Sequence, residues 1–453
     1  MSLRLPLDAA VAADFSVAAA LGRGLPCSCG RTHRTRLRAF AVEAEVERRV
    51  PELVREWGYR KPFLVMDANT ERVQGAAVRR ALAAAGFAAP GFVFPDAELV
   101  PDESALERLE AAAATAADGV DLWIAVGSGT LNDLVRYVAW RRGQPYLVVA
   151  TAPSMDGYAS GVSPLIIDRM KQTLNAQSPL AILADPNVLA AAPERLLAAG
   201  VGDVLGKYSA LADWELGHIV TGEIYCPFIV ARVARSRDAV LAARRAIRRR
   251  EVAAVTELFN ALIEVGIGMD YQGNSRPASG AEHHLSHFWE MQQLLAGRHA
   301  PPHGIQVAYG ALLTAGLWQA LPATCPVTEG ALTHAGDREA WERGIRRIYG
   351  PAAPPVLALA EAESLHDPGL RRERLAAIRA NWSRIYALRD LLPQRAELEA
   401  AYRDIGLPLA ASDIEVSPER ERDGLIWARD LRSRYTIFRL HEDLGLSTVL
   451  DER

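Results

Sequence analysis

VDLWIAVGSGTLND, residues 120–133, joins a short apolar run to two glycines and then to a helical pattern. The run at residues 120–126 predicts a buried strand, because it is short, apolar and closed by glycine. A helix is expected over residues 130–142. Free N–H groups and the dipole at the start of that helix attract an anion, and Gly127 and Gly129 allow its close approach. The stretch predicts a phosphate site, with a plain tight turn as the alternative.

The same alternation of strand and helix extends to both sides of this turn. It indicates a parallel sheet covered by helices on both faces. We expect the residues before about 57 to be irregular, with short helical pieces at 40–50 and 51–57, and a hairpin over 163–180. The further predicted strands are 62–66, 92–94, 146–150 and 181–185, and the helices between them are 71–85 and 104–117.

From about Pro186 strand signals fade, and alanine- and leucine-rich helical stretches continue to the end of the chain. A chain of 453 residues is too long for one ordinary core, so two domains are expected. We predict an α/β domain over residues 1–186 and an all-helical domain over residues 187–453. The predicted helices of the second domain are 190–199, 204–218, 232–246, 253–266, 280–295, 304–318, 338–349, 371–392 and 395–405.

Composition excludes several classes of protein. The net charge of −4 gives no electrostatic reason to expect a nucleic acid or an anionic membrane. No apolar run is expected to reach membrane-spanning length, and Asp8 and Asp14 in the opening residues argue against a signal peptide. Cys27 and Cys29 have the wrong spacing for a zinc knuckle and are awkward for a disulfide. We therefore expect reduced thiols and a cytoplasmic location.

Residues 275–304, SRPASGAEHHLSHFWEMQQLLAGRHAPPHG, hold five of the ten histidines. His283 and His287 are four residues apart, so on a helix they share one face. With His303 and the upstream Asp203 they offer a first shell for zinc, iron or nickel that leaves a position open for substrate. The alternative is that these histidines cap helices and cover surface.

Other candidates come from strand ends and from composition. Asp67 ends a predicted strand, where a carboxylate can bind ribose hydroxyls or simply cap a helix. The loop at residues 151–160 follows the strand 146–150, at the edge of the sheet where open α/β folds bind ligands. Lys207 is one of only three lysines among 51 basic residues, which weakly indicates a need for its compact ammonium.

Five motifs in order resemble those of the sn-glycerol-1-phosphate dehydrogenases, in the superfamily of iron-containing alcohol dehydrogenases, glycerol dehydrogenases and dehydroquinate synthases. The resemblance covers roughly residues 55–320, and the SRPASGAEH element points to the glycerol-1-phosphate branch. It implies a Rossmann-like N-terminal dinucleotide-binding domain and a C-terminal helical metal-binding domain, as in dehydroquinate synthase. The motifs are GSGTLND at 127–133, TAPSMDGYAS at 151–160, GDVLGK at 202–207, SRPASGAEH at 275–283 and HG at 303–304.

The resemblance also implies roles for individual residues. Asp203, His283 and His303 correspond to the metal ligands. Asp156, Lys207 and His287 correspond to substrate-side, catalytic positions. Arg276 is our own candidate for the substrate phosphate, from its charge and placement, and the alternative is that it pairs with a carboxylate to hold its loop. The expected cofactor-binding residues are Asp67, Gly127, Ser128, Gly129, Thr130, Asn132, Asp133, Thr151, Ser154 and Ser160.

The implied reaction is the reversible reduction of dihydroxyacetone phosphate to sn-glycerol 1-phosphate, a step of phospholipid biosynthesis. NAD(H) or NADP(H) supplies the hydride, and one divalent metal (zinc, nickel or iron) polarises the ketone. Because Asp67 would repel a 2′-phosphate, NAD is favoured. A homodimer or larger homo-oligomer is expected. The alternatives are a glycerol or other alcohol dehydrogenase, a dehydroquinate-synthase-like cyclase and a non-catalytic scaffold.

Overall fold

A computed structural model describes residues 17–22, 24–96, 98–116, 119–167, 170–327 and 338–446. The chain divides into two compact units, one of Met1–Val204 with Pro227–Ser275 and one of Leu205–Cys226 with Arg276–Arg453. The first unit thus takes in helical segments beyond the sheet domain expected from sequence. Asp8 and Asp14, on which the signal-peptide prediction depends, lie outside the described residues.

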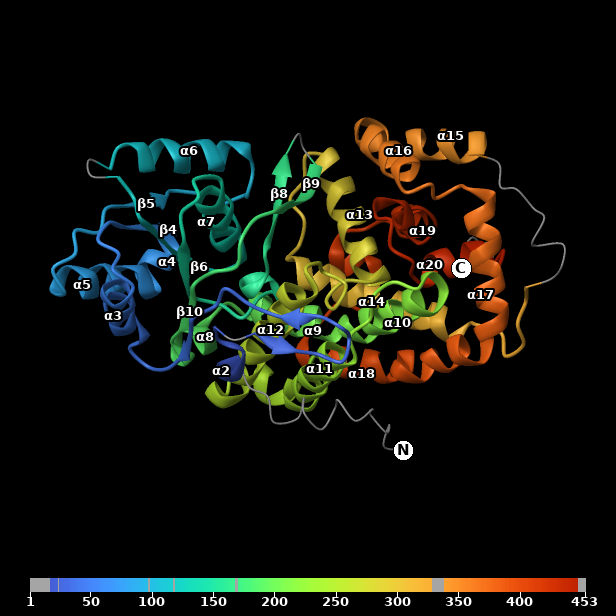
Figure 1. Cartoon of the computed structure of the whole chain (residues 1–453), viewed down its shortest axis with the longest axis horizontal. Coiled ribbons are helices and arrows are strands. Elements are labelled where there is room, and N and C mark those ends of the chain that lie inside the picture. The colour runs from blue at the N-terminus through green and yellow to red at the C-terminus, as the bar shows by residue number, and fades with distance from the viewer. Residues whose placement is uncertain are drawn as a thin grey trace. The chain divides into compact units, whose positions relative to one another are not determined.

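A six-stranded parallel sheet forms the centre of the first unit, and this confirms the predicted fold class (Figure 1). The strand order is β3-β10-β7-β6-β4-β5, so the chain moves outward from β4 to β5 and then continues on the other side of β4. The loops after β4 and β6 therefore leave the sheet at its switch point, where such folds bind ligands. The strands are β3 (Ala39–Val42), β4 (Pro62–Asp67), β5 (Gly91–Phe94), β6 (Leu122–Gly127), β7 (Tyr146–Ala150) and β10 (Ala181–Ala184).

Helices pack on this sheet and complete the unit. Apolar side chains of α3, α5, β4, β6, β7 and β10 form one buried cluster, which explains the continuous apolar runs in the sequence. Small hairpins pair β1 (Leu25–Pro26) with β2 (Thr32–His33) and β8 (Val162–Ile167) with β9 (Met170–Asn175). The helices of this unit are α2 (Val17–Ala20), α3 (Arg49–Glu56), α4 (Ala68–Thr70), α5 (Ala76–Ala84), α6 (Glu103–Ala114), α7 (Gly129–Arg141), α8 (Pro186–Ala191), α11 (Pro227–Arg248) and α12 (Val252–Gln272), and α9 (Glu194–Leu205) ends at the boundary between the units.

Two expectations about these segments were wrong. The predicted helix at residues 40–50 is wrong in its first half, because Ala39–Val42 form the edge strand β3 paired with β10, and helical structure begins only at Val46. The four residues of β3, AFAV, are apolar and all partly exposed, and so short an apolar run does not distinguish a strand from the start of a helix. α12 reaches the length and hydropathy of a membrane span, contrary to the sequence-based expectation, but most of it is buried and it packs on α11 and α8.

The second unit is helical. Its helices α13 and α14 pack against each other and carry the predicted histidines. Asp213 holds the start of α13, because its Oδ2 accepts a hydrogen bond from the Ala281 N–H at 2.7 Å while its Oδ1 accepts one from the Ile437 N–H. The described helices of this unit are α10 (Lys207–Thr221), α13 (Ala281–Leu295), α14 (His303–Gln319), α15 (Arg338–Tyr349), α16 (Ala353–Ala362), α17 (Pro368–Ala387), α18 (Arg395–Ile405), α19 (Pro418–Trp427) and α20 (Ile437–Asp443).

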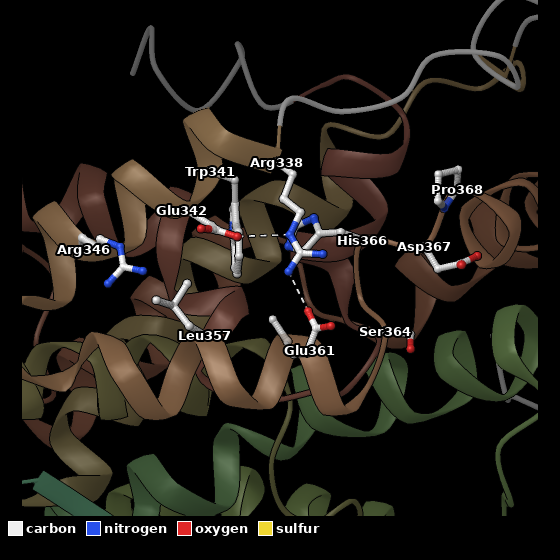
Figure 2. A pocket seen from close by; sticks show the side chains of 11 residues that line it. Arg338, Trp341, Glu342, Arg346, Leu357, Glu361, Ser364, His366, Asp367 and Pro368 are labelled. Carbon is white, nitrogen blue, oxygen red and sulfur yellow. Dashed lines mark hydrogen bonds and ion pairs between the residues drawn. The ribbon is translucent and has the colours of Figure 1, made fainter.

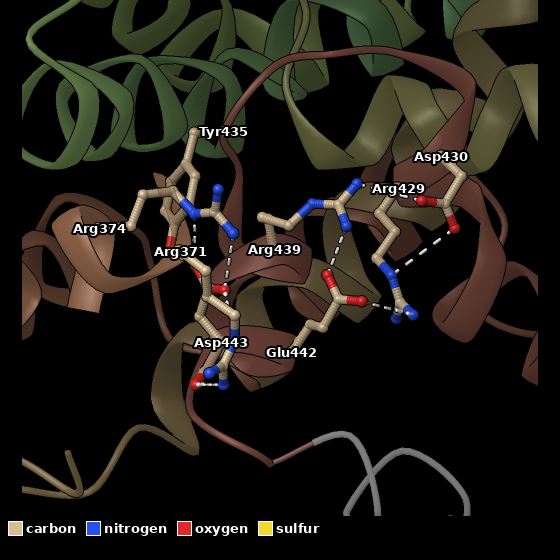
Figure 3. A network of polar contacts seen from close by, with 8 residues as sticks. All are labelled: Arg371, Arg374, Arg429, Asp430, Tyr435, Arg439, Glu442 and Asp443. Atoms are coloured by element: carbon tan, nitrogen blue, oxygen red, sulfur yellow. Dashed lines mark hydrogen bonds and ion pairs between the residues drawn. The ribbon is translucent and has the colours of Figure 1, made fainter. Parts of the chain in front are cut away.

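Hydrogen bonds and ion pairs connect α20 to α17 and to the segment that precedes α20 (Figure 3). Asp443 accepts two hydrogen bonds from the Arg374 guanidinium, at 2.9 and 3.0 Å, and a third from the Tyr435 hydroxyl at 2.9 Å. Arg439 pairs with Asp430 and Glu442 on the other side of the helix. Since Asp443 is almost fully buried, these bonds fix the segment that leads into α20.

Candidate active site

The glycine turn lies at the predicted position, between the end of β6 and the start of α7. A Cβ added to Gly127 would lie 2.3 Å from Leu131 Cδ1, and one added to Gly129 would lie 3.2 Å from Met155 Cγ. Ser128 is the N-cap residue of α7, yet its side chain makes no capping hydrogen bond. The first N–H groups of α7 are therefore not capped by a side chain, and the glycines add no side chain that would block an anion. Such a helix start suits a phosphate group.

Two neighbouring strand ends lie at the same edge of the sheet. Val65 of β4 pairs with Ala125 of β6, and each strand ends two residues later, at Asp67 and Gly127; Gly127 in turn pairs with Ala150 at the end of β7. The Oδ1 atom of Asp67 accepts hydrogen bonds from the N–H groups of Asn69 and Thr70, at 2.9 and 2.7 Å. Asp67 is therefore a helix cap in this structure, and its contact with ribose stays a prediction.

Asn132 and Asp133 point into the protein rather than to the turn's surface. Both are buried, and Asp133 Oδ1 accepts a hydrogen bond from Arg136 at 2.8 Å. Arg136 also donates to the carbonyls of Gly157 and Tyr158, so this pair holds the loop that follows β7. Burial, only partly offset by the charge of Arg136, raises the pKa of Asp133 to about 7.

The loop after β7 is held close to the glycine turn. Thr151 donates its N–H to the Gly127 carbonyl at 3.2 Å, and the Ser160 hydroxyl donates to the Gly157 carbonyl at 3.0 Å. The N–H of Asp156 donates to Asp203 Oδ2 at 3.0 Å, and Asp203 is fully buried on α9. The hydroxyl of Ser154 hydrogen-bonds to Tyr158. The residues predicted at 151–160 are therefore brought together with Gly127 within one unit.

Three imidazoles gather in the second unit, as the spacing predicted. The ring centroids of His283 and His303 are 5.1 Å apart, those of His287 and His303 are 5.2 Å apart, and those of His283 and His287 are 6.1 Å apart. Nitrogens of His283 and His303 lie within 4.8 Å of each other, a separation that a single metal ion can bridge. A helix start at His303 after Pro302 turns the third imidazole toward α13.

Glu282 orients the first of these histidines. Its Oε1 accepts a hydrogen bond from His283 Nδ1 at 2.7 Å and a second from the Gly280 N–H at 2.9 Å. Burial would raise the pKa of Glu282, but the bond to His283 and the nearby Lys207 ammonium hold it below its usual value. A carboxylate on one imidazole nitrogen leaves the other nitrogen for a metal, an arrangement found at many metal sites. The donor set therefore fits a divalent metal.

A second possible set overlaps the first. His287, Glu290 and His303 also offer atoms within 4.8 Å of one another, and His287 Nδ1 lies 3.8 Å from Glu290 Oε2. The Ser286 hydroxyl lies 3.1 Å from His303 Nδ1. The long distance between His287 and Glu290 contrasts with the close bond to His283, so His283 is the more firmly oriented ligand.

Arg276 is engaged by a carboxylate in the second unit. Its Nε donates to Glu223 Oε2 at 2.8 Å, a second guanidinium nitrogen pairs with Glu223 Oε1, and it also donates to the Tyr435 carbonyl at 2.8 Å. The side chain is 2% exposed. This is the structural alternative to the predicted phosphate contact, and a phosphate at Arg276 would compete with Glu223.

Two further arginines escaped the sequence prediction. Arg434 donates to the Ser279 carbonyl at 3.1 Å, in the same loop as Arg276. Burial, together with the charges of Arg276 and Arg432, lowers the pKa of Arg434 to about 9. Clustered guanidinium groups that depress one another's pKa attract an anion. The sequence offered one signal for these two arginines, which is their close spacing in Arg432-Ser433-Arg434.

Lys207 is fully buried at the start of α10. Its charge helps to lower the pKa of Glu282, which bonds His283, so Lys207 belongs to the surroundings of the histidines.

A cavity of about 470 Å³ in the same unit lies elsewhere in the chain, among Trp341, Glu342, Glu361 and His366. Figure 2 shows Arg338 bridging the two glutamates in that cavity while the His366 ring lies against Trp341. None of the predicted site residues lines it.

Comparisons with known proteins point to one family. The family model described as iron-containing alcohol dehydrogenase matches residues 41–193. A protein of Bacillus licheniformis named glycerol-1-phosphate dehydrogenase (NAD(P)+) is 30% identical over 423 residues, which cover 93% of this chain and 92% of that relative. A protein of the same name from Halalkalibacterium halodurans is 31% identical and covers 93% and 96%.

Solved structures agree on the fold. Sulfoacetaldehyde reductase from Bifidobacterium kashiwanohense, in complex with NAD+, matches with a TM-score of 0.61 at 13% identity, over 92% of this chain and 98% of that chain. A probable glycerol dehydrogenase from Sinorhizobium meliloti matches with a TM-score of 0.57 at 16% identity, over 91% and 97%. At such identities the likeness supports the architecture alone.

Proposed function

Because the chain belongs to the glycerol-1-phosphate dehydrogenase family, we propose that it catalyses the reversible NAD(P)H-dependent reduction of dihydroxyacetone phosphate to sn-glycerol 1-phosphate. The similarity to two relatives of that name over more than 90% of each chain is the observation that carries the proposal. The glycine turn and the histidine group support the proposal, because the reaction needs a cofactor site and a metal that polarises the ketone.

The proposed metal ligands are Asp203, His283 and His303. His283 and His303 lie in one unit with their nitrogens close together, and Asp203 is included because it lies in the GDVLGK motif at residues 202–207. A divalent metal bound there would withdraw electrons from the ketone oxygen, and the reduced nicotinamide would supply the hydride. Glu282 acts through His283, since it fixes the ring and raises its basicity.

The dinucleotide is assigned to the turn after β6 and the loop after β7. Gly127, Ser128, Gly129 and Thr130 would receive the pyrophosphate at the start of α7. Asn132 and Asp133 would support that turn from inside, because both are buried and Asp133 holds Arg136. The nicotinamide side is assigned to Thr151, Ser154 and Ser160, and the ribose to Asp67.

His287 is proposed to pass a proton to the substrate oxygen when the ketone is reduced. It is partly exposed and lies one helical turn from His283 on the same face of α13, so it can exchange protons with solvent. Lys207 and Asp156 are proposed to position the substrate. The buried ammonium of Lys207 is a compact donor suited to a single oxygen.

The substrate phosphate is proposed to bind at Arg276, Arg432 and Arg434. These side chains act on one another electrostatically within the second unit, and burial strengthens that repulsion. A phosphate dianion would relieve that repulsion, whereas unphosphorylated dihydroxyacetone would not. Glu223 partly neutralises the group when no substrate is bound, because it pairs with Arg276.

The test compares two substrates with purified, metal-loaded protein. NADH oxidation is followed with dihydroxyacetone phosphate and with dihydroxyacetone, and the product's stereochemistry is checked with a stereospecific glycerol-phosphate assay. We expect the phosphorylated ketone to be preferred by at least about a hundredfold in kcat/KM, since charged hydrogen bonds contribute about 1.5–3 kcal/mol each. Equal turnover of both ketones would indicate a plain alcohol dehydrogenase instead.

Matched variants locate the phosphate. Arg434→Met should reduce kcat/KM for dihydroxyacetone phosphate by roughly ten- to several-hundred-fold and leave the weak rate with dihydroxyacetone unchanged. Arg276→Met should do the same if Arg276 binds substrate. If Arg276→Met lowers both rates equally and lowers the melting temperature, Arg276 serves the pairing with Glu223 and the other two arginines carry the phosphate.

A glycerol dehydrogenase is the second candidate. Its substrate carries no phosphate, and in this structure Arg276 pairs with Glu223, so Arg276 need not serve a phosphate. A cyclase is less favoured, because dehydroquinate-synthase-like enzymes typically have Glu where Asp203 stands.

We further propose a cytoplasmic enzyme that assembles as a homodimer or larger homo-oligomer. Light scattering on the purified protein measures that assembly, and a monomer at micromolar concentration would contradict it.

A further inference from the structure

The tertiary structure places a sulfur-rich group of side chains in the first unit, in segments that the proposed reaction does not use. Cys27 and Cys29 lie in the connection between β1 and β2, and His33 is the last residue of β2. Cys29 Sγ lies 3.5 Å from His33 Nε2. The two sulfurs and a ring nitrogen of His33 all lie within 4.8 Å of one another. Sequence spacing alone argued against a zinc knuckle here, because it did not include His33.

His33 is oriented as a metal ligand would be. Its side chain is 1% exposed, and its Nδ1 lies 3.3 Å from the Tyr271 carbonyl oxygen. A carbonyl can only accept a hydrogen bond, so Nδ1 is the protonated nitrogen and Nε2 faces the sulfurs with its lone pair. The rings of Tyr271 and Phe228 stack on the imidazole, with centroids 5.1 and 6.2 Å away. This is the outer support expected around a ligating histidine.

The hairpin itself is fixed for such a role. The Cys27 N–H donates to the Arg31 carbonyl at 3.0 Å, and the Gly30 N–H donates to the Cys27 carbonyl at 3.0 Å, so the two cysteines sit in a tight turn. Gly30 has φ of 82°, which a glycine adopts without strain. Arg31 donates to the Gln272 carbonyl at 3.0 Å and fastens the turn to the end of α12.

A fourth ligand follows from chain connectivity. Cys226 is bonded directly to Pro227, where the first unit resumes, and Phe228 in that segment already stacks on His33. Cys226 is fully buried, and none of the four cysteines forms a disulfide. Three thiolates and one neutral imidazole make a closed tetrahedral set, which is typical of structural zinc and leaves no position for substrate.

We propose that Cys27, Cys29, His33 and Cys226 bind one structural zinc ion, separate from the metal at His283 and His303. The sulfurs of a tetrahedral site with Zn–S bonds of about 2.3 Å are roughly 3.8 Å apart, which the observed spread of the ligand atoms accommodates with small side-chain rotations. Binding releases the thiol protons to solvent as the thiolates coordinate the ion. The zinc would link the β1–β2 hairpin to Cys226 at the start of α11, next to the hairpin's contacts with the end of α12.

Cobalt substitution tests the proposal on the full-length protein. Thiolate-to-cobalt charge transfer gives an absorption band in the near ultraviolet, and the proposed catalytic ligands contain no sulfur. We expect this band in wild type and undiminished in His283→Ala. Its absence from cobalt-loaded wild type would overturn the proposal.

Metal stoichiometry gives the second test. The Cys27→Ser/Cys29→Ser variant should hold one zinc per chain fewer than wild type after equilibration with zinc, and it should unfold at a lower temperature. It should keep the metal-dependent NADH oxidation at permissive temperature. Cys325→Ser is the matched control, a partly buried cysteine outside the group, and it should lose no zinc. Equal zinc contents in the double variant and the control would refute the site, and if the double variant does not fold, the cobalt band of wild type decides.

Discussion

Glu282→Gln tests whether the metal is bound through His283. Glu282 is fully buried and accepts a 2.7 Å hydrogen bond from His283 Nδ1, so its charge favours the metal-binding form of that imidazole. Glutamine has nearly the same shape and can still accept that bond, but it carries no charge. A charge-assisted bond contributes about 1.5–3 kcal/mol and a neutral one about 0.5–1.5 kcal/mol. The difference of about 1–1.5 kcal/mol corresponds to roughly tenfold weaker metal binding.

The assay is a competition between the protein and a chromophoric chelator, which gives the dissociation constant for zinc or nickel. The melting temperature of the metal-free variant is measured in parallel, because Glu282 Oε2 is buried without a hydrogen-bond partner among the described residues and an amide there can lower stability. His283→Ala, which removes a ligand, should abolish tight binding at this site while the metal-free fold survives.

Glu290→Gln is the matched control on the same helix. Glu290 lies 3.8 Å from His287, too far for a firm hydrogen bond, so its replacement should change metal affinity by less than about twofold. The opposite result, with Glu290→Gln weakening binding and Glu282→Gln leaving it unchanged, would refute the reasoning. The metal would then belong to the set of His287, Glu290 and His303.

Three other predictions follow from the structure. Gly129→Val should raise KM for NADH at least about tenfold, with KM for dihydroxyacetone phosphate unchanged, because its Cβ stands where an anion would approach the start of α7; steady-state kinetics measures this, and an unchanged cofactor KM contradicts it. Burial raises the pKa of Asp133 to about 7, so its contribution to stability is full below about pH 4 and is lost as pH rises through 7, by at most ~1.4 kcal/mol per pH unit. Urea unfolding should therefore show a flatter pH dependence for Asp133→Asn over pH 4–7, and equal slopes would show that the carboxyl is ionised throughout. Asp443→Asn should cost about 3 kcal/mol of unfolding free energy, because it breaks a buried pair with Arg374; a loss below 1 kcal/mol in urea unfolding would mean that Arg374 finds another partner.

The local pattern of the sequence predicted most of the architecture. Short apolar runs predicted five of the six parallel strands. The four inner strands are buried and read as continuous apolar sequence, and the edge strand β5 was predicted from its Phe-Val-Phe run. The four-residue spacing of His283 and His287 predicted that both lie on one face of a helix, and both lie on α13. β3 was missed because its four apolar residues, AFAV, fit the start of a helix as well as a strand.

Tertiary structure decided what the individual side chains contact. The bond between Arg276 and the Tyr435 carbonyl joins residues 159 positions apart, and the pairing of His33 with Tyr271 joins residues 238 positions apart. No spacing rule reaches that far, because such contacts depend on how whole helices pack. The sequence therefore determined most of the order of strands and helices, with β3 as the exception, and the identity of the candidate ligands. The fold decided that Glu282 orients His283, that Glu223 engages Arg276, and that a histidine joins Cys27 and Cys29.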